Sequence, residues 1–372
     1  MNWKVAFIDL KAQFKNLRPE ILHQIKRVMK NASFILRNDV RKFEENMAAF
    51  LDIKHVIGLN SGTDALFLAL KASGIGPGDE VITVAHTFVA TLATIIHTGA
   101  KPTLVDVDEN FNMDWRLVEK AISHKTKAIL PVHLNGRLCQ MDKLKSLAKK
   151  HKLLIIEDAA QALGAAFKGK RAGAFGTAGC FSLHPMKNLG CAGDGGFVAT
   201  NDKKIAQSIR LLRNHGQRTK EDIAFFGYNS RLDNLQAAII NVKFGYLKKW
   251  IDKRRKTATL YNQGLKDLPL ILPRPPSNED FFDVFSSYVI RSPDQAGLFS
   301  YLRKKRIEVF IHWPKPLHRQ KNLGLKKFYL PKTEQFSKEV ISLPIYPEIT
   351  AGQINFVIKT ITEFHRRKNK SK

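Results

Sequence analysis

HVIGLNSGTDALFLALKASGIGPGDEVITV, residues 55–84, is the segment that decides the fold. Its first apolar run, His55–Leu59, is typical of a buried strand, and residues 63–72 have the spacing of a helix. A second apolar run, Glu80–Val84, again predicts a strand. Apolar strands separated by helices indicate a mostly parallel sheet that is covered on both faces.

The same alternation continues downstream. Helices are expected over residues 89–97 and 141–151, and further strands over 102–106, 128–132, 153–156, 178–183 and 196–200. Only the Gly-rich segment Gly190–Gly196 separates the last two strands. Because that connection is too short for a helical crossover, this pair should be antiparallel. The expected sheet therefore has seven strands and is mixed.

The pattern changes after about residue 247. A long amphipathic stretch over residues 235–265 leads into a Pro-rich linker at 272–276. Beyond it we expect a strand at 287–291, a helix at 294–306, a strand at 308–311 and a terminal helix near 351–367. These elements predict a large α/β domain over residues 1–247 and a smaller α+β domain over residues 248–372.

The composition is that of an ordinary globular protein, with 372 residues, 44% of them hydrophobic and 25% charged. Cys139, Cys180 and Cys191 stand apart without CxxC spacing, which favours a reducing compartment and no cysteine-ligated metal. Residues 1–9 have too short an apolar core for a signal peptide, and polar residues interrupt the apolar stretch 81–100. We therefore expect a cytoplasmic protein that does not span a membrane.

The net charge of +28 allows several interpretations. It suits nucleic-acid binding, attraction of an acidic substrate, or a lysine-rich source proteome. Basic clusters occur at residues 248–256 and 366–372, but neither has the interleaved aromatic residues of a single-strand binder or a DNA-reading motif. Solvated surface charge is the favoured interpretation, and nucleic-acid binding is the less favoured one.

Two polar positions suggest the chemistry. Asp158, within Glu157-Asp158-Ala-Ala-Gln161, follows a buried strand, and Lys187 follows the strand that ends near Ser182. A lysine and an aspartate at this sheet edge suit pyridoxal phosphate (PLP), where the lysine forms a Schiff base and the aspartate keeps the ring nitrogen protonated. Partial burial would lower the pKa of Lys187, as such a lysine requires. In isolation, Asp158 is equally well a helix N-cap. A lone lysine in a loop, such as Lys187, is a solvated charge far more often than a nucleophile.

Weaker signals surround this pair. Asn60–Asp64 lies at a strand-to-helix junction, where free N–H groups and the Thr63 hydroxyl suit a phosphate or simply cap a helix. Phe88 is suited to stacking on the ring or to core packing. The segment Asn229-Ser-Arg231 precedes a helix, and His312-Trp313 to His318 forms a loop that suits a sugar nucleotide. No carboxylate or cysteine accompanies those histidines at metal-ligand spacing, so no metal is expected.

Together these segments resemble the DegT/DnrJ/StrS family of PLP-dependent nucleotide-sugar aminotransferases, which have the fold-type I architecture. The resemblance covers nearly the whole chain and rests on a series of motifs in one order: Asn60–Leu66, Gly74–Ile82, Glu157–Gln161, Ser182–Gly196, Gly227–Asp233, His312–His318 and Leu343–Glu348.

The resemblance implies a role for most of the candidate residues. Lys187 would form the Schiff base and carry the proton, Asp158 would pair with the pyridinium, and Gln161 would lie against the ring hydroxyl. The phosphate would be held by Gly62, Thr63 and Ser182, and by Asn229 of the other subunit of a homodimer. The amino donor, which is glutamate in most of the family, and the keto sugar would react one after the other at the same site. The expected substrate contacts are His184, Arg231, His312, Trp313 and His318.

Several positions depart from the family pattern. Residues 36–39 replace a common Gly-Pro, while Trp313 and Asn135 stand where tyrosine is common. Asn188-Leu-Gly190 with Gly193–Gly196 resembles the branch that aminates C3 more than the C4 branch. Rival functions are a PLP-dependent sugar dehydratase and a basic regulatory protein that binds nucleic acid. One dehydratase type has histidine in place of Lys187, and the other needs a cysteine-ligated iron–sulfur cluster.

Overall fold

The computed structural model describes residues 3–370, with side chains through Arg367. The start of the segment analysed as a signal peptide and the end of the basic tail at 366–372 therefore lie outside the described residues. Between residues 3 and 370, no helix combines the length and the apolar character needed to cross a membrane.

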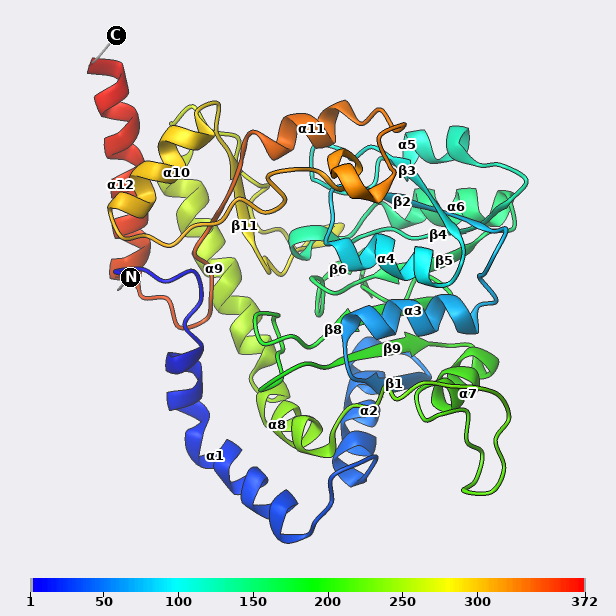
Figure 1. Ribbon diagram of the computed structural model, residues 1–372. Helices are drawn as coiled ribbons and strands as arrows, with labels where there is room; N and C mark the ends of the chain where they lie inside the picture. Colours follow the sequence, from blue (N-terminus) through cyan, green and yellow to red (C-terminus); the bar gives the residue numbers. More distant parts are fainter. Residues whose placement is uncertain (1–2, 371–372) are drawn as a thin grey trace.

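A mixed seven-stranded sheet forms the centre of the structure (Figure 1). Its strand order is β1-β9-β8-β5-β4-β2-β3, and β9 runs antiparallel to both of its neighbours while the other pairs are parallel. This confirms the expected mixed sheet and its antiparallel pair. The strands are β1 (His55–Leu59), β2 (Glu80–Val84), β3 (Lys101–Val105), β4 (Thr126–Ile129), β5 (Leu154–Asp158), β8 (Ala178–Ser182) and β9 (Gly196–Thr200).

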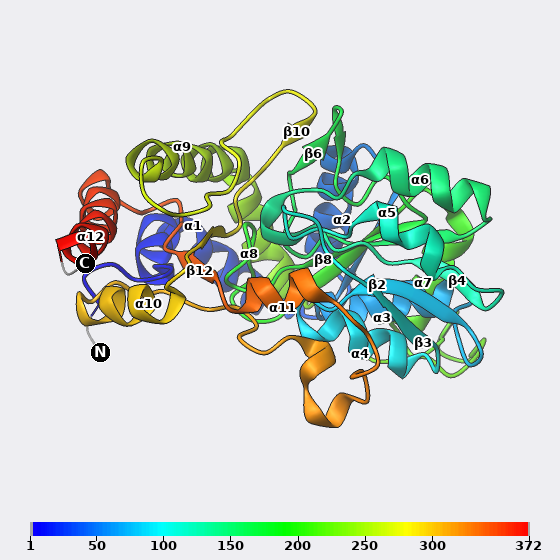
Figure 2. The ribbon, with the colours of Figure 1, turned by 90° about the horizontal axis from the view of Figure 1, so that it is seen from above.

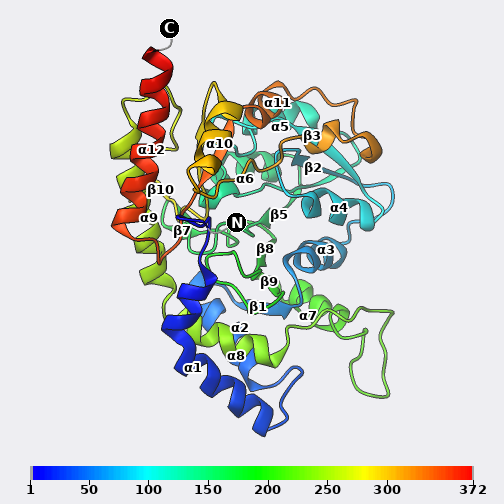
Figure 3. The same ribbon diagram turned by 60° about the vertical axis from the view of Figure 1, so that its left-hand side comes forward.

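Helices cover both faces of this sheet, as its almost wholly buried strands require. In Figure 3, α3 (Gly62–Ala72), α4 (Val89–His97) and α7 (Lys203–Leu212) lie on one side, and α2 (Asn38–Leu51) and α8 (Asn234–Phe244) on the other. Ser61 caps α3 by accepting a hydrogen bond from the Asp64 N–H at 3.0 Å. That cap fixes the start of α3 directly after β1.

The C-terminal part builds a second hydrophobic cluster around α9 (Leu247–Leu265), β11 (Tyr288–Arg291), α10 (Gln295–Lys304), β12 (Val340–Leu343) and α12 (Ala351–Lys370). Viewed from above, these elements lie beside the large sheet (Figure 2). Val5 joins this cluster and forms a bridge with Ile307, so the start of the chain packs on its C-terminal part. The division at residue 247 remains a prediction, and it coincides with the first residue of α9.

One expectation for the C-terminal part is corrected. Residues 308–311 do not form a regular strand, because Phe310 makes only an isolated bridge with Ser342; β12 pairs with β11 instead. The amphipathic stretch 235–265 is divided into α8 and α9 at Gly245. The remaining α-helices and strands are α1 (Leu10–Lys30), α5 (Trp115–Val118), α6 (Met141–Lys150), α11 (Pro331–Ser337), β6 (Ala166–Phe167), β7 (Lys170–Arg171) and β10 (Phe281–Phe282).

Candidate active site

Lys187 and Asp158 meet at the carboxyl edge of the sheet. Asp158 is the last residue of β5, and β8, which pairs with β5 in parallel, ends at Ser182, five residues before Lys187. The two charges are close enough for each to shift the pKa of the other. The parallel pairing of β5 with β8 therefore brings the two principal candidate residues to one place.

Asp158 is buried, with 6% of its surface exposed. Its Oδ2 accepts a hydrogen bond from the Thr91 hydroxyl at 2.8 Å, and its Oδ1 accepts one from the Ala160 N–H at 3.2 Å. Burial raises the pKa of Asp158, and these two hydrogen bonds and the charge of Lys187 oppose that rise. A cation placed beside this carboxylate would be strongly stabilised.

Lys187 is half-buried in the loop after β8. Its backbone N–H donates to the His184 carbonyl at 2.9 Å, and the His184 N–H donates to Ser182 Oγ at 3.2 Å. Burial lowers the pKa of Lys187, while the Asp158 carboxylate raises it. An amine that gives up its proton more readily than usual is suited to forming a Schiff base.

A phosphate-sized cradle lies where α3 begins. The N–H groups of Gly62 and Thr63 belong to the first turn of the helix and have no acceptor within it. A Cβ on Gly62 would lie only 2.7 Å from Ser182 Cβ, so the helix start is pressed against the end of β8. Free N–H groups, the positive end of a helix and the Ser182 hydroxyl together fit a phosphate, as PLP requires.

Gln161 and Phe88 complete the expected cofactor contacts. Gln161 Oε1 accepts a hydrogen bond from the Asn135 N–H at 2.8 Å, which orients the amide. Phe88 precedes α4, and 60% of its surface is exposed although it follows a buried strand. An exposed aromatic ring at this position is available for stacking on a flat ligand.

An aromatic cluster adjoins Lys187. The His86 ring lies 5.6 Å from that of Phe111 and 5.3 Å from that of Trp313, and Trp313 lies 5.6 Å from His312. Burial lowers the pKa of His86 to about 4, assisted by His312. Burial and then the charge of Lys187 lower the pKa of His312 to about 4. Both imidazoles are therefore neutral near neutral pH, and His312 lies within electrostatic range of Lys187 with Trp313 beside it.

The structure does not bring every candidate residue to this place. His318 is fully buried, and its Nε2 contacts Glu334 Oε1 at 3.1 Å, so its ring is not available to a substrate. This corrects the expectation for His318. Arg231 donates to Asn214 Oδ1 at 3.2 Å, and Asn229 is exposed.

Three residues of this region were not predicted from the sequence. Glu157 was noted only as part of the Asp158 motif, and His86 and Thr91 were given no role in the site. Glu157 is fully buried, and its carboxylate accepts three backbone N–H groups at 2.7–2.8 Å and contacts His133 Nε2 at 2.9 Å. This network fixes the end of β5 and so the position of Asp158. The only local signal for His86 was its place just after β2.

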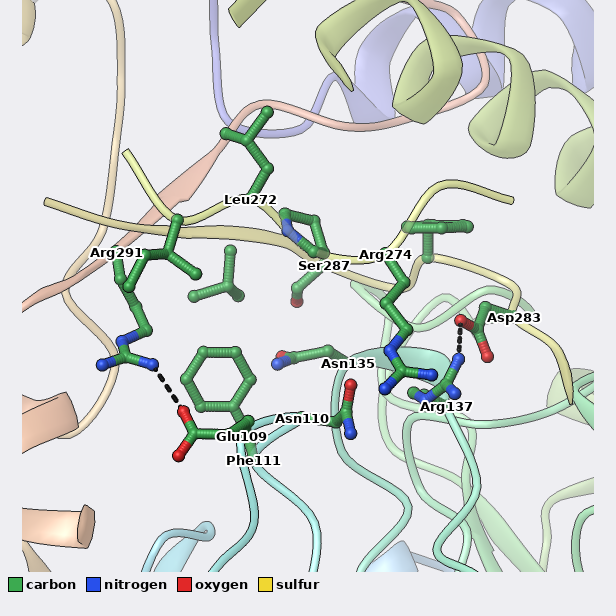
Figure 4. A pocket seen from close by; sticks show the side chains of 14 residues that line it. Glu109, Asn110, Phe111, Asn135, Arg137, Leu272, Arg274, Asp283, Ser287 and Arg291 are labelled. Atoms are coloured by element: carbon green, nitrogen blue, oxygen red, sulfur yellow. Dashed lines mark hydrogen bonds and ion pairs between the residues drawn. The ribbon is translucent and has the colours of Figure 1, made fainter. Parts of the chain in front are cut away.

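A cavity of about 200 Å³ lies between the two parts of the chain (Figure 4). Two ion pairs lie in the wall of this cavity: Arg291 with Glu109 at 2.9 Å, and Arg137 with Asp283 at 2.6 Å. Phe111 lines the cavity and also stacks on His86. The cavity therefore shares a wall with the aromatic cluster beside Lys187.

Comparison with known proteins identifies the family. Residues 15–362 match the DegT/DnrJ/EryC1/StrS aminotransferase family. A "pleiotropic regulatory protein" of Geobacillus stearothermophilus is 44% identical over 97% of this chain and 99% of its own length. A dTDP-3-amino-3,4,6-trideoxy-alpha-D-glucose transaminase of Streptomyces venezuelae is 41% identical, covering 98% and 97%.

A third relative, a UDP-N-acetyl-3-dehydro-alpha-D-glucosamine 3-aminotransferase of Acidithiobacillus ferrooxidans, is 42% identical over 95% of this chain and 96% of its own length. The crystal structure of S. venezuelae DesV superposes with a TM-score of 0.94 at 40% identity, covering 98% of this chain and 99% of that one. The chain therefore belongs to the DegT/DnrJ/EryC1/StrS aminotransferase family and is a PLP-dependent aminotransferase.

Proposed function

We propose that this aminotransferase moves an amino group from glutamate to the keto group of a nucleotide-linked sugar. The observation that carries the proposal is the pair formed by Lys187 and Asp158 at the carboxyl edge of the sheet, beside the cradle at Gly62. The names of the two transaminase relatives support the substrate class, because both refer to amino sugars on a nucleotide carrier.

PLP supplies an electron-accepting ring that stabilises the charge left when a substrate C–H bond breaks. In the proposal, Lys187 Nζ would hold the aldehyde end of the cofactor until the substrate amine takes its place, and the freed Nζ would then take the proton from the substrate carbon and return it. Asp158 would keep a proton on the ring nitrogen. The phosphate would be held by Gly62, Thr63 and Ser182, while Phe88 and Gln161 would contact the ring and its hydroxyl.

The substrate would lie against the aromatic cluster. Because the pKa of His312 is about 4, its imidazole is neutral near pH 7 and is able to donate or accept a hydrogen bond from a sugar hydroxyl. Trp313 offers a flat surface for a sugar or a base. His184, which is exposed next to the Lys187 loop, and Arg231 remain predicted substrate contacts.

Amination at C3 is the preferred regiochemistry. The motif at residues 188–196 resembles the C3 branch, and the names of both transaminase relatives place the amino group at position 3. The test supplies a panel of dTDP- and UDP-linked keto sugars with glutamate and locates the new amine by NMR. Product aminated only at C4 would exclude this regiochemistry but leave the aminotransferase assignment intact.

Lys187→Ala tests the site itself. The variant should lose both the visible absorbance of the bound cofactor and turnover, since no other amine replaces Nζ beside Asp158. Lys168→Ala is the matched control, because Lys168 is exposed and its ammonium forms a surface ion pair with Asp142 at 2.9 Å. A Lys187→Ala variant that still aminates keto sugars at the wild-type rate would overturn the proposed mechanism.

We further propose a homodimer in the cytoplasm, with Asn229 reaching the phosphate of the partner subunit. Asn229 is exposed, and the loop that precedes it carries exposed apolar residues, Phe226 above all, as an interface would. Subunit mixing is the test: inactive Lys187→Ala and Asn229→Ala chains should regain activity when combined, because the hybrid dimer contains one intact shared site. Mixtures that remain inactive would contradict a shared site.

The rival functions give different results in the same assays. A dehydratase would release a dehydrated keto sugar without a new amine. A nucleic-acid-binding regulator would shift duplex DNA in a salt-dependent way and would tolerate Lys187→Ala. The three cysteines are separate buried thiols, an arrangement that does not favour the cluster-dependent dehydratases.

A further inference from the structure

A chain of hydroxyl groups leads from α4 to Asp158. Thr87 Oγ1 lies 2.8 Å from Thr91 Oγ1, and Thr91 Oγ1 lies 2.8 Å from Asp158 Oδ2. Thr91 is fully buried and Thr87 is 1% exposed. Neither threonine belongs to the set of cofactor contacts named above.

The chemistry of the carboxylate fixes the direction of this chain. An ionised carboxylate only accepts hydrogen bonds, so the Thr91 hydroxyl must donate to Asp158. The Thr91 oxygen is then free to accept, and the Thr87 hydroxyl donates to it. A hydrogen bond donated to the carboxylate in this way stabilises its ionised form.

The helix itself adds to the effect. Thr91 is the third residue of α4, so the carboxylate of Asp158 lies near the positive end of that helix. Phe88, the proposed stacking residue, stands immediately before the same helix. The start of α4 therefore carries both the proposed stacking residue, Phe88, and the hydroxyl that bonds Asp158.

These contacts act against a large opposing effect. Burial raises the pKa of Asp158, and the Thr91 hydroxyl is the largest of the influences that lower it, followed by the Ala160 N–H. A hydrogen bond to a charged group contributes about 1.5–3 kcal/mol, more than one to a neutral group. Loss of the Thr91 hydroxyl would remove the hydrogen bond that Oδ2 accepts from residues 3–370, and Asp158 would remain buried.

We propose that Thr91, supported by Thr87, is a positioning residue that orients the Asp158 carboxylate and keeps it ionised, so that Asp158 holds the proton on the cofactor ring nitrogen. The inference rests on the proposed cofactor contacts of Asp158. It adds a residue that touches neither cofactor nor substrate and acts through its partner.

The test compares Thr91→Val, which removes the hydroxyl at nearly constant volume, with Thr91→Ser, which keeps it. Thr94→Val is the matched control, because Thr94 is fully buried on the same helix but its hydroxyl bonds only a backbone carbonyl, that of Thr91, at 3.2 Å. The readouts are the dissociation constant of PLP from titration of the cofactor-free protein, the visible absorbance of the bound cofactor as a function of pH, and kcat.

Thr91→Val should weaken PLP binding about tenfold to a hundredfold and displace the pH dependence of the absorbance. Thr91→Ser should stay within about threefold of wild type, and Thr94→Val should leave all three readouts unchanged. If Thr91→Val does not fold, Thr87→Val takes its place, with an expected loss of about threefold to tenfold. Unchanged affinity and absorbance in the variant that folds would overturn the inference.

Two further outcomes are decisive. Equal losses in Thr91→Val and Thr94→Val would mean that helix packing, and not the hydroxyl on Asp158, controls the site, which also overturns the inference. A wild-type protein that binds no PLP would instead contradict the proposed function. The two failures are therefore distinguishable by the wild-type titration.

Discussion

Replacing His86 with phenylalanine is expected to make the protein less sensitive to acid. Burial lowers the pKa of His86 to about 4, against 6.5 for the same group in the unfolded chain. At a pH between these two values, His86 binds a proton in the unfolded chain but not in the folded chain. Stability therefore falls as the pH falls from 6.5 towards 4, and it is insensitive to this group above 6.5.

The size of the effect follows from the two pKa values. Between about pH 7.5 and pH 5, His86 alone should remove about 2 kcal/mol from the free energy of unfolding. His86→Phe has no such group, and phenylalanine is able to keep the stacked contact with Phe111 and the edge contact with Trp313. The variant should therefore lose about 2 kcal/mol less than wild type over this interval.

Urea unfolding at both pH values, at one protein concentration and without added cofactor, measures the difference. Contributions common to both proteins cancel when the two pH-induced changes are compared. His97→Phe is the matched control, because His97 is a nearby histidine at the end of α4 whose side chain is exposed; it should behave as wild type. A His86→Phe protein that loses as much stability as wild type would refute the assignment of a buried neutral imidazole.

Three other changes have defined outcomes. Gly62→Ala places a Cβ 2.7 Å from Ser182 Cβ and should weaken PLP binding about tenfold in an equilibrium titration, whereas Gly352→Ala, whose Cβ meets nothing nearer than 3.9 Å, should not. Glu157→Gln would place an amide N–H₂ against the backbone N–H groups that now donate to the carboxylate, and it should lower the free energy of unfolding by about 3 kcal/mol. The control Glu45→Gln, on the surface, should lower it by about 0.5 kcal/mol. His318→Ala should cost about 2 kcal/mol of stability but leave KM for the keto sugar unchanged, while His312→Ala should raise KM; an altered KM in His318→Ala would restore His318 to the site.

The large sheet could be predicted because its strands are short apolar runs separated by clear helices. The small region was harder, since β12 and β11 lie about fifty residues apart in the chain and pair only in the folded state. The break between α8 and α9 is also not evident in the sequence, because the amphipathic pattern continues through Gly245. The backbone angles of Gly245, φ −57° and ψ −21°, are close to helical values.

The site shows the same division. Asp158 and Lys187 follow strands, and the ends of parallel strands meet at one edge of a sheet, so their proximity was predictable. His312 and His318 lie in one loop, and no local pattern separates them. Only the folded chain places Ser342 beside the first and Glu334 beside the second. Thr91 was not predictable, because its partner Asp158 comes from another strand.

The reversed strand β9 explains why the phosphate cradle can form at all. Since β9 runs antiparallel to its neighbours, its first residue, Gly196, lies level with Ser182, the last residue of β8, and with Leu59, the last residue of β1. A Cβ on Gly196 would lie 2.3 Å from the Ser61 carbonyl carbon, so the backbone at the start of α3 rests directly on this glycine. The connection between β8 and β9, residues 183–195, also carries Lys187. The β8–β9 connection and the reversed strand therefore position both Lys187 and the backbone beneath the proposed phosphate site.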